Sequence, residues 1–144
     1  MRTFSKAYGL AGLRVGFALA SSEIIDMLNR VRQAFNVNSL AQAAACAALD
    51  DLAFLRESVR VNNEGMQQIT DAFRRLGISF IESSGNFVTF HCGDAKMLNQ
   101  FMLERGVIVR PLAGYGMSNS LRVSIGLPSE NARFIEVLEE AMAD

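Results

Sequence analysis

The chain has 144 residues, of which 50% are apolar and 20% charged, and its 14 Lys and Arg against 15 Asp and Glu leave a formal charge of −1. This composition excludes an intrinsically disordered or low-complexity chain. The lack of a basic excess argues against a nucleic-acid-binding scaffold. A single histidine and two widely separated cysteines, Cys46 and Cys92, argue against a structural zinc site. We therefore expect a globular chain that binds neither metal nor nucleic acid.

The first residues have the outline of a secretory signal, because basic residues are followed by an apolar stretch and small residues. Arg14 interrupts that stretch, and Gly9, Gly12 and Gly16 would break a helix through it. No uninterrupted apolar segment elsewhere is long enough to span a membrane. These features favour a cytoplasmic protein that does not bind a membrane.

The first 50 residues predict one strand and two helices. Residues 15–20 form an apolar run with a β-branched start, which predicts a buried strand. Residues 22–34 carry apolar side chains at helical spacing, and a break at residues 35–38 separates this helix from a second one at 39–49, with Ser39 as its candidate cap. The second helix is almost entirely Ala, Leu and Cys. We therefore expect it to be buried against a large neighbour.

The rest of the chain predicts helices and short strands whose ends carry capping residues, glycines or a proline. In chain order these are a helix at 51–76, strands at 78–82 and 86–91, a helix at 94–105, strands at 107–110 and 121–125, and a helix at 128–143. This order predicts a small α/β subdomain with a mixed or antiparallel sheet covered by helices. We accordingly divide the chain into residues 1–50 and 51–144.

The segment TFSKAYGLAGLRVG at residues 3–16 places two hydroxyls, one amine and one guanidinium among glycines. Hydroxyls, backbone N–H groups and an arginine suit a phosphate. A lysine on an apolar wall has a lowered pKa and forms a Schiff base with an aldehyde. Pyridoxal phosphate carries both groups. From the residues alone, a solvated lysine and a surface arginine in a loop remain the alternative.

The string SKAYGLAGLRVGFALAS resembles the cofactor-lysine segment of fold-type I pyridoxal-phosphate aminotransferases, in the histidinol-phosphate aminotransferase branch. The strings RQAFNVNSLAQAA, SSGNFVTF and RGVIVRPLAGYGMSNSLRVSIG extend the resemblance over essentially the whole chain. By this resemblance Lys6 is the Schiff-base lysine, and Arg14, with Thr3 and Ser5, binds the cofactor phosphate.

The resemblance also implies that Arg122 binds the anionic end of the substrate and that Arg110 binds the substrate phosphate. The alternative for Arg110 is a salt bridge to an acid such as Glu104 or Glu130. Arg122 stands in an apolar strand sequence and therefore needs an anion. Tyr115, in the loop between the two arginines, either lines the pocket or packs as an ordinary surface residue.

The activity implied is transfer of an amino group through pyridoxal phosphate, between histidinol phosphate and 2-oxoglutarate in histidine biosynthesis, by a homodimeric enzyme with small-molecule substrates. Family members are more than twice as long as this chain. Residues 1–50 correspond to the last part of the large cofactor-binding domain, and residues 51–144 to the small domain. We therefore expect a fragment of a transferase that is inactive by itself.

Two other interpretations stay open. Within the same fold, the complete protein could be an aromatic or other amino-acid aminotransferase, or a decarboxylase of an amino-acid phosphate. In a different class, the chain could be a non-enzymatic dimerisation module whose interface is the apolar helix at residues 41–49.

Overall fold

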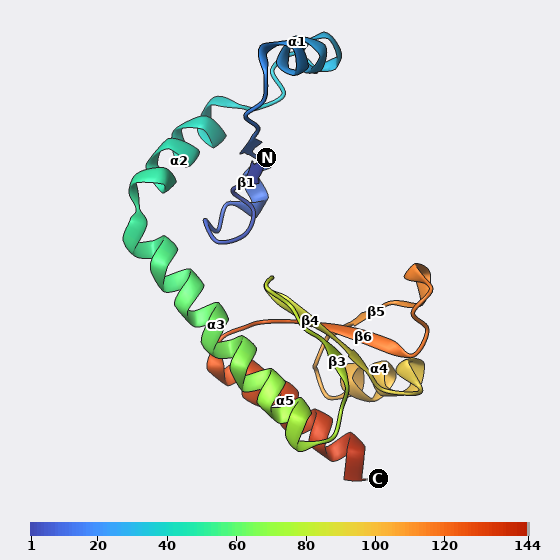
Figure 1. Cartoon of the computed structure of the whole chain (residues 1–144). Helices are drawn as coiled ribbons and strands as arrows, with labels where there is room; N and C mark the ends of the chain where they lie inside the picture. The colour runs from blue at the N-terminus through green and yellow to red at the C-terminus, as the bar shows by residue number, and fades with distance from the viewer. Residues whose placement is uncertain (144) are drawn as a thin grey trace. The chain divides into compact units, whose positions relative to one another are not determined.

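The computed structural model describes residues 1–143 and divides into two compact units, Met1–Val59 and Arg60–Asp144 (Figure 1). The boundary falls inside a long helix, α3, at Leu52–Arg75. No helix within the described residues combines the length and the apolar composition needed to cross a membrane.

The first unit contains a two-stranded ribbon, a single 3-10 turn and two helices ahead of α3. In chain order these are β1 at Arg2–Thr3, η1 at Ala11–Leu13, β2 at Gly16–Phe17, α1 at Ser22–Val31 and α2 at Ser39–Asp50. The strands pair antiparallel, with Arg2 opposite Phe17 and Thr3 opposite Gly16. The ribbon therefore joins the two ends of the segment that carries the candidate lysine.

The buried strand expected at residues 15–20 is wrong in length and in burial. Only Gly16 and Phe17 pair, and both are exposed. Among the described residues the strand has β1 as its single partner. The first helix also ends early, at Val31, because Arg32 adopts an extended backbone with φ −68° and ψ 132°.

Helix α2 begins where the sequence predicts, but a different residue caps it. The Asn38 Oδ1 accepts the Ala41 backbone N–H at 2.8 Å, so Asn38 and not Ser39 is the cap. Only Ala41 and Ala45 of α2 are buried. The expectation that this helix is buried against a large neighbour is therefore not confirmed within residues 1–143.

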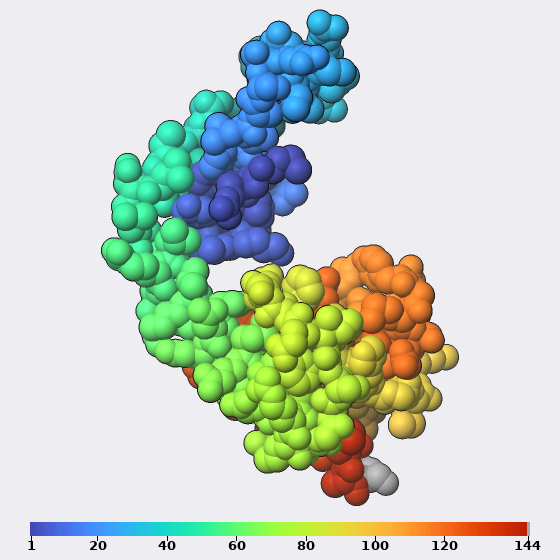
Figure 2. All heavy atoms as spheres, viewed as in Figure 1, coloured from blue at the N-terminus to red at the C-terminus, as the bar shows by residue number. Residues whose placement is uncertain are grey.

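Helix α1 has an amphipathic sequence with no buried residue. Its apolar residues Ile24, Leu28 and Val31 are 50%, 49% and 79% exposed. In the space-filling view this helix and the turn after it form a separate lobe of the first unit (Figure 2). An isolated helix of this length is only marginally stable in water and normally depends on packing of its apolar face. The exposed apolar residues show that α1 lacks such packing in the first unit.

The second unit contains a four-stranded sheet in which every neighbouring pair is antiparallel, which decides between the mixed and antiparallel alternatives. The strand order is β3, β4, β6, β5, at Phe80–Ile81, Phe87–His91, Ser120–Ser124 and Arg110–Pro111. The strand expected at 107–110 is reduced to the pair Arg110–Pro111. The reason is that the Val107 N–H bonds to the Met102 carbonyl at 2.9 Å, within the turn that ends the preceding helix.

One face of this sheet packs against the end of α3 and two further helices, α4 at Ala95–Glu104 and α5 at Pro128–Ala143 (Figure 1). At its centre Phe73 of α3, Phe90 of β4 and Phe134 of α5 are fully or almost fully buried. Their ring centroids lie 4.8 Å (Phe73–Phe90), 5.9 Å (Phe90–Phe134) and 6.1 Å (Phe73–Phe134) apart. Burial alternates along β4, and along β6 from Leu121 onward, so the opposite face of the sheet is not covered by these helices; Ser120 at the start of β6 is buried as well.

The predicted helix ends of the second unit are confirmed. Gly77 and Gly106 adopt φ of +69° and +76° after α3 and α4, as the left-handed end of a helix requires. The Asp94 Oδ1 accepts the Met97 N–H at 2.9 Å and caps α4. The glycines and the Asp94 cap act within a few residues of the helix ends, so these bounds do not depend on tertiary contacts.

Replacing Asp94 by Ala should destabilise the second unit by about 1 kcal/mol, because the first turn of α4 loses its side-chain acceptor. Asp94→Asn is the matched control, since Asn caps as well as Asp. Urea unfolding followed by far-UV circular dichroism measures both changes. Equal losses in the two variants would show that the charge of Asp94, and not its capping bond, stabilises α4.

Candidate active site

The segment that carries the candidate lysine is closed on itself by backbone hydrogen bonds. The Phe4 N–H donates to the Val15 carbonyl at 3.2 Å, and the Leu10 N–H donates to the Phe4 carbonyl at 2.9 Å. The Phe4 side chain is 3% exposed, and its ring packs against Tyr8 and Phe17 at centroid distances of 4.9 and 6.0 Å. Phe4 therefore anchors a loop whose polar side chains remain accessible.

Lys6 lies at the start of a tight turn inside this loop. Its carbonyl accepts the Gly9 N–H at 2.8 Å, and Gly9 has φ +72°. A Cβ at Gly9 would lie 3.3 Å from the Phe54 ring, so glycine is required both by the backbone and by the neighbouring side chain. The Lys6 side chain is exposed. Its backbone is thus fixed while its amine is accessible to a ligand.

Thr3 and Ser5 are linked by a hydrogen bond in which the Ser5 N–H donates to the Thr3 Oγ1 at 3.1 Å. The Thr3 oxygen is an acceptor in this bond, so its hydroxyl proton remains available for an anion. The structure therefore brings these two predicted residues together.

Arg14 adopts the left-handed conformation, with φ 54° and ψ 49°, at the end of η1. A non-glycine residue in this region carries strain of order 1–3 kcal/mol, and such strain often accompanies functional sites. The Arg14 Nη1 donates to the Ala11 carbonyl at 2.9 Å. This bond holds the guanidinium beside its own loop and leaves its other N–H groups for an anion.

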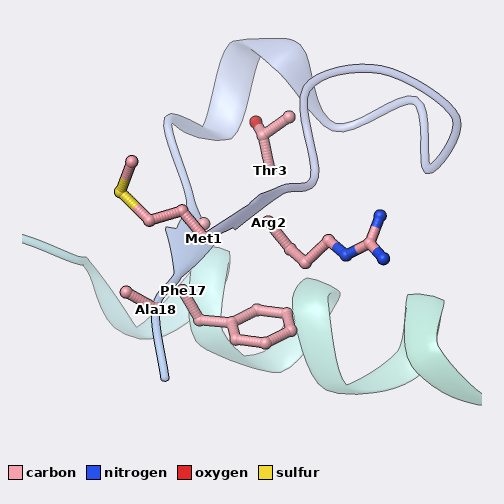
Figure 3. Close-up of a pocket in the computed structure, with 6 residues that line it drawn as sticks. Met1, Arg2, Thr3, Phe17 and Ala18 are labelled. Carbon is pink, nitrogen blue, oxygen red and sulfur yellow. The ribbon is translucent and has the colours of Figure 1, made fainter. Parts of the chain in front are cut away.

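A shallow hollow lies beside the β1–β2 ribbon (Figure 3), lined by Met1, Arg2, Thr3, Gly16, Phe17 and Ala18. The Arg2 and Thr3 side chains point to opposite sides of the strand. A Cβ at Gly16 would lie 2.7 Å from the Arg2 carbonyl oxygen, so only glycine allows this ribbon to close. Of the predicted cofactor residues Thr3 alone lines the hollow, and the structure does not gather Lys6 and Arg14 into it.

In the second unit Arg110 and Arg122 are direct partners in the β5–β6 register, and Arg122 is also opposite Thr89 of β4. Directly opposed residues share one face, with their Cβ atoms about 4.5–5.5 Å apart. This row lies on the face of the sheet away from the aromatic core, because Leu121 and Val123 on either side of Arg122 are buried. Two like charges in this position repel each other unless an anion binds between them.

Arg122 has further unmet bonding capacity. Its guanidinium carbon lies 4.5 Å from the centroid of the Phe87 ring, and its Nε is buried without a hydrogen-bond partner in the described chain. A buried donor without an acceptor costs about 1–3 kcal/mol. The sequence predicts that Arg122 binds an anion. Phe87 lies within the string SSGNFVTF, but the sequence did not indicate its contact with Arg122.

Arg110 does not form the salt bridge that was its alternative. Glu104 accepts a hydrogen bond from Gln100, and Glu130 accepts one from the Leu127 N–H. The Arg110 Nη2 instead donates to the Tyr115 hydroxyl at 3.1 Å. Arg110 is therefore exposed on the open face, with a neutral partner.

A second polar group on the same face involves His91, whose Nδ1 lies 2.8 Å from the fully buried Ser120 Oγ. The Ser120 hydroxyl donates to the Asn119 Oδ1 at 3.2 Å. The adjacent Cys92 is half-buried, and burial, reinforced by the charge of Asp94, raises the pKa of its thiol. Cys92 is therefore a protonated thiol at neutral pH and a poor nucleophile.

The structure places the predicted residues in two groups. Thr3, Ser5, Lys6 and Arg14 belong to the closed loop of the first unit, and Arg110 and Arg122 belong to the sheet of the second. Among the described residues no cluster of three or more His, Cys, Asp or Glu side chains could hold a metal ion. The chemistry available is that of an amine, hydroxyls and guanidiniums.

Residues 1–138 match the family described as "Aminotransferase class I and II". The chain is 59% identical over 141 residues to histidinol-phosphate aminotransferase 1 of Dechloromonas aromatica, a match that covers 98% of this chain and 39% of that protein. The chain thus spans about two fifths of the length of such relatives.

Two solved structures share the fold. Histidinol-phosphate aminotransferase from Sinorhizobium meliloti, in complex with pyridoxal-5'-phosphate, has a TM-score of 0.85 and 30% identity over 98% of this chain and 40% of its own. L-threonine-O-3-phosphate decarboxylase from Porphyromonas gingivalis has a TM-score of 0.78 and 26% identity over 99% of this chain and 46% of its own.

Proposed function

The chain belongs to the class I and II aminotransferase family, and on that basis we propose that it is part of a pyridoxal-phosphate enzyme that transfers the amino group of histidinol phosphate to 2-oxoglutarate in histidine biosynthesis. The structural observation that carries the proposal is the register pair Arg110–Arg122. Two opposed guanidiniums on an open face, one with a buried unsatisfied N–H, suit a substrate that ends in a phosphate.

The residues of the closed loop fit pyridoxal phosphate by their chemistry. When bound, this cofactor supplies an aldehyde that combines with amines and a ring that withdraws electrons from the reacting carbon. Lys6 would hold the aldehyde end through its exposed Nζ. Arg14, already fixed by the Ala11 carbonyl, would hold the phosphate together with the hydroxyls of Thr3 and Ser5.

Each residue has a separate task in the proposed reaction. Lys6 Nζ, as a free amine, would accept the proton from the substrate Cα as a general base. Arg110 and Arg122 bind the anionic end of the substrate and so fix its orientation. Precise positioning of the substrate supplies a large part of such catalysis.

We also propose a cytoplasmic homodimer with small-molecule substrates. Both cysteines are free, which suits a reducing compartment. Apolar side chains of α2 such as Leu40, 77% exposed, and Leu49, 46% exposed, provide a surface for association. The structural similarity to a phosphate-substrate decarboxylase keeps decarboxylation of an amino-acid phosphate as the second candidate activity.

The proposal is tested with a chimera in which this chain replaces the matching segment of the Dechloromonas aromatica enzyme. We expect the purified chimera to convert histidinol phosphate and 2-oxoglutarate, and the 144-residue chain alone to be inactive, since it lacks the remaining family fold that would complete the site. A folded chimera that releases carbon dioxide from an amino-acid phosphate instead would support the decarboxylase. Transamination by the chain alone would show that the fragment interpretation is wrong.

Lys6 should carry the cofactor in that chimera. Borohydride treatment should abolish the visible absorption of the bound cofactor and leave it attached to the peptide that contains Lys6, because Lys6 provides the reactive amine. Mass spectrometry of the digest locates the label. Lys96→Arg, at the other lysine of the chain, is the control and should change nothing. A label on any other lysine would contradict the assignment.

Arg122→Ala should raise the substrate KM by about tenfold or more, because charge-assisted hydrogen bonds contribute about 1.5–3 kcal/mol each. Arg110→Ala should impair a phosphate-bearing substrate more than an unphosphorylated amino acid. Steady-state kinetics measure both, and Arg133→Ala, at an exposed arginine paired with Glu136, is the control. Equal losses for both substrates in the Arg110 variant would indicate a general structural role.

A further inference from the structure

The open face of the sheet carries a third group beside the two arginines, the phenol of Tyr115. The Arg110 Nη2 donates to its hydroxyl at 3.1 Å, while the guanidinium carbon is 5.8 Å from the ring centroid. Arg122, by contrast, lies over its aromatic neighbour Phe87 at 4.5 Å. Arg110 therefore contacts the hydroxyl of its aromatic partner, whereas Arg122 contacts the ring.

The backbone that presents Tyr115 is fixed by three hydrogen bonds. The N–H groups of Tyr115 and Met117 donate to the Leu112 carbonyl at 2.9 and 3.2 Å, and the Gly116 N–H donates to the Ala113 carbonyl at 3.0 Å. Gly116 has φ +77°, and Leu112 is buried beneath the turn. This turn is η2, at Ala113–Tyr115. Tyr115 is thus held on a rigid turn directly beside the arginine pair.

Ordinary packing does not account for this side chain. Tyr115 is 67% exposed, so it buries little apolar area in the second unit. Its hydroxyl oxygen accepts the Arg110 N–H, which leaves the hydroxyl proton free to be donated. A neutral donor in contact with Arg110, whose register partner is Arg122, suits an anion that binds to these guanidiniums.

We propose that Tyr115 is a further substrate-binding residue. Its hydroxyl donates a hydrogen bond to the substrate phosphate and also holds Arg110 in place for the same anion. This inference rests on the proposed function and deepens it. A phosphate monoester offers three acceptor oxygens and close to two negative charges, whereas a carboxylate offers two oxygens and one charge. The added donor therefore favours phosphate-bearing substrates over carboxylates.

The first test is steady-state kinetics of the chimera with Tyr115→Phe, which removes the hydroxyl and keeps the ring. We expect KM for histidinol phosphate to rise about three- to tenfold, with kcat and the KM for an unphosphorylated amino acid changed less than about twofold. Met117→Leu, in the same turn, is the control. A rise that is equal for both substrates, or no rise, would overturn the proposal.

A double-mutant cycle separates a role through Arg110 from a general effect on the turn. In the Arg110→Ala background, Tyr115→Phe should change KM by less than about twofold, because the residues share one anion and one hydrogen bond. Tyr115→His, which keeps a ring donor, should restore part of the affinity. An undiminished effect of Tyr115→Phe without Arg110 would show that the tyrosine does not act with this arginine.

A direct binding measurement keeps this inference separable from the proposed function. Inorganic phosphate is titrated into the isotopically labelled 144-residue chain while the side-chain Nε–H signals of Arg110 and Arg122 are followed by NMR. Phosphate should shift both signals, and Tyr115→Phe should weaken the affinity about threefold. An inactive wild-type chimera would refute the proposed function alone, whereas unchanged phosphate affinity in the variant would refute the role of Tyr115.

Discussion

The packing of Phe73, Phe90 and Phe134 determines which face of the sheet is buried, and the candidate substrate site depends on it. Phe90 is the fourth residue of β4, and its ring lies 4.8 Å from that of Phe73 and 5.9 Å from that of Phe134. Because side chains alternate along a strand, a slip of one residue would move every side chain to the other face. With Phe90 and its partner Leu121 in the core, Arg122 must lie on the open face. The adjacent β5 then places Arg110 opposite it.

The same core explains how the open face tolerates unfavourable chemistry. Two opposed arginines, and a buried Arg122 Nε that finds no acceptor among residues 1–143, both oppose folding. The second unit offsets these costs with the aromatic cluster, the capped helices and the hydrogen bonds of the buried Asn131. The Asn131 Oδ1 accepts the Gly126 N–H, and its Nδ2 donates to the Gly126 carbonyl and to the Gln68 Oε1 of α3. A rigid scaffold that carries unsatisfied cationic groups is typical of a preorganised binding site.

Local sequence signals predicted the helices of the second unit, its turns and the antiparallel option for its sheet. Asp94, Gly77 and Gly106 act through contacts within a few residues, so sequence is sufficient to interpret them. The pairing of Arg110 with Arg122 was beyond such reasoning, because cross-strand register is a tertiary property. Sequence identified the loop of Lys6 by composition and resemblance, yet the burial of Phe4 and the left-handed backbone of Arg14 depend on how the loop closes.

The errors in the first unit share one physical cause. The sequence predicts burial for residues 15–20 and for α2 because their side chains are apolar. An apolar segment indicates that the segment is covered by other protein, but not that this cover lies within the same 144 residues. In the described chain Phe17, Leu40 and Leu49 are exposed instead. Covering a side chain of this size contributes about 1.5–3 kcal/mol. On the proposed function, the remaining three fifths of an aminotransferase or a second copy would cover these surfaces. The loop that carries Lys6, in contrast, is already closed by its own hydrogen bonds, so association would stabilise the first unit without having to build the loop.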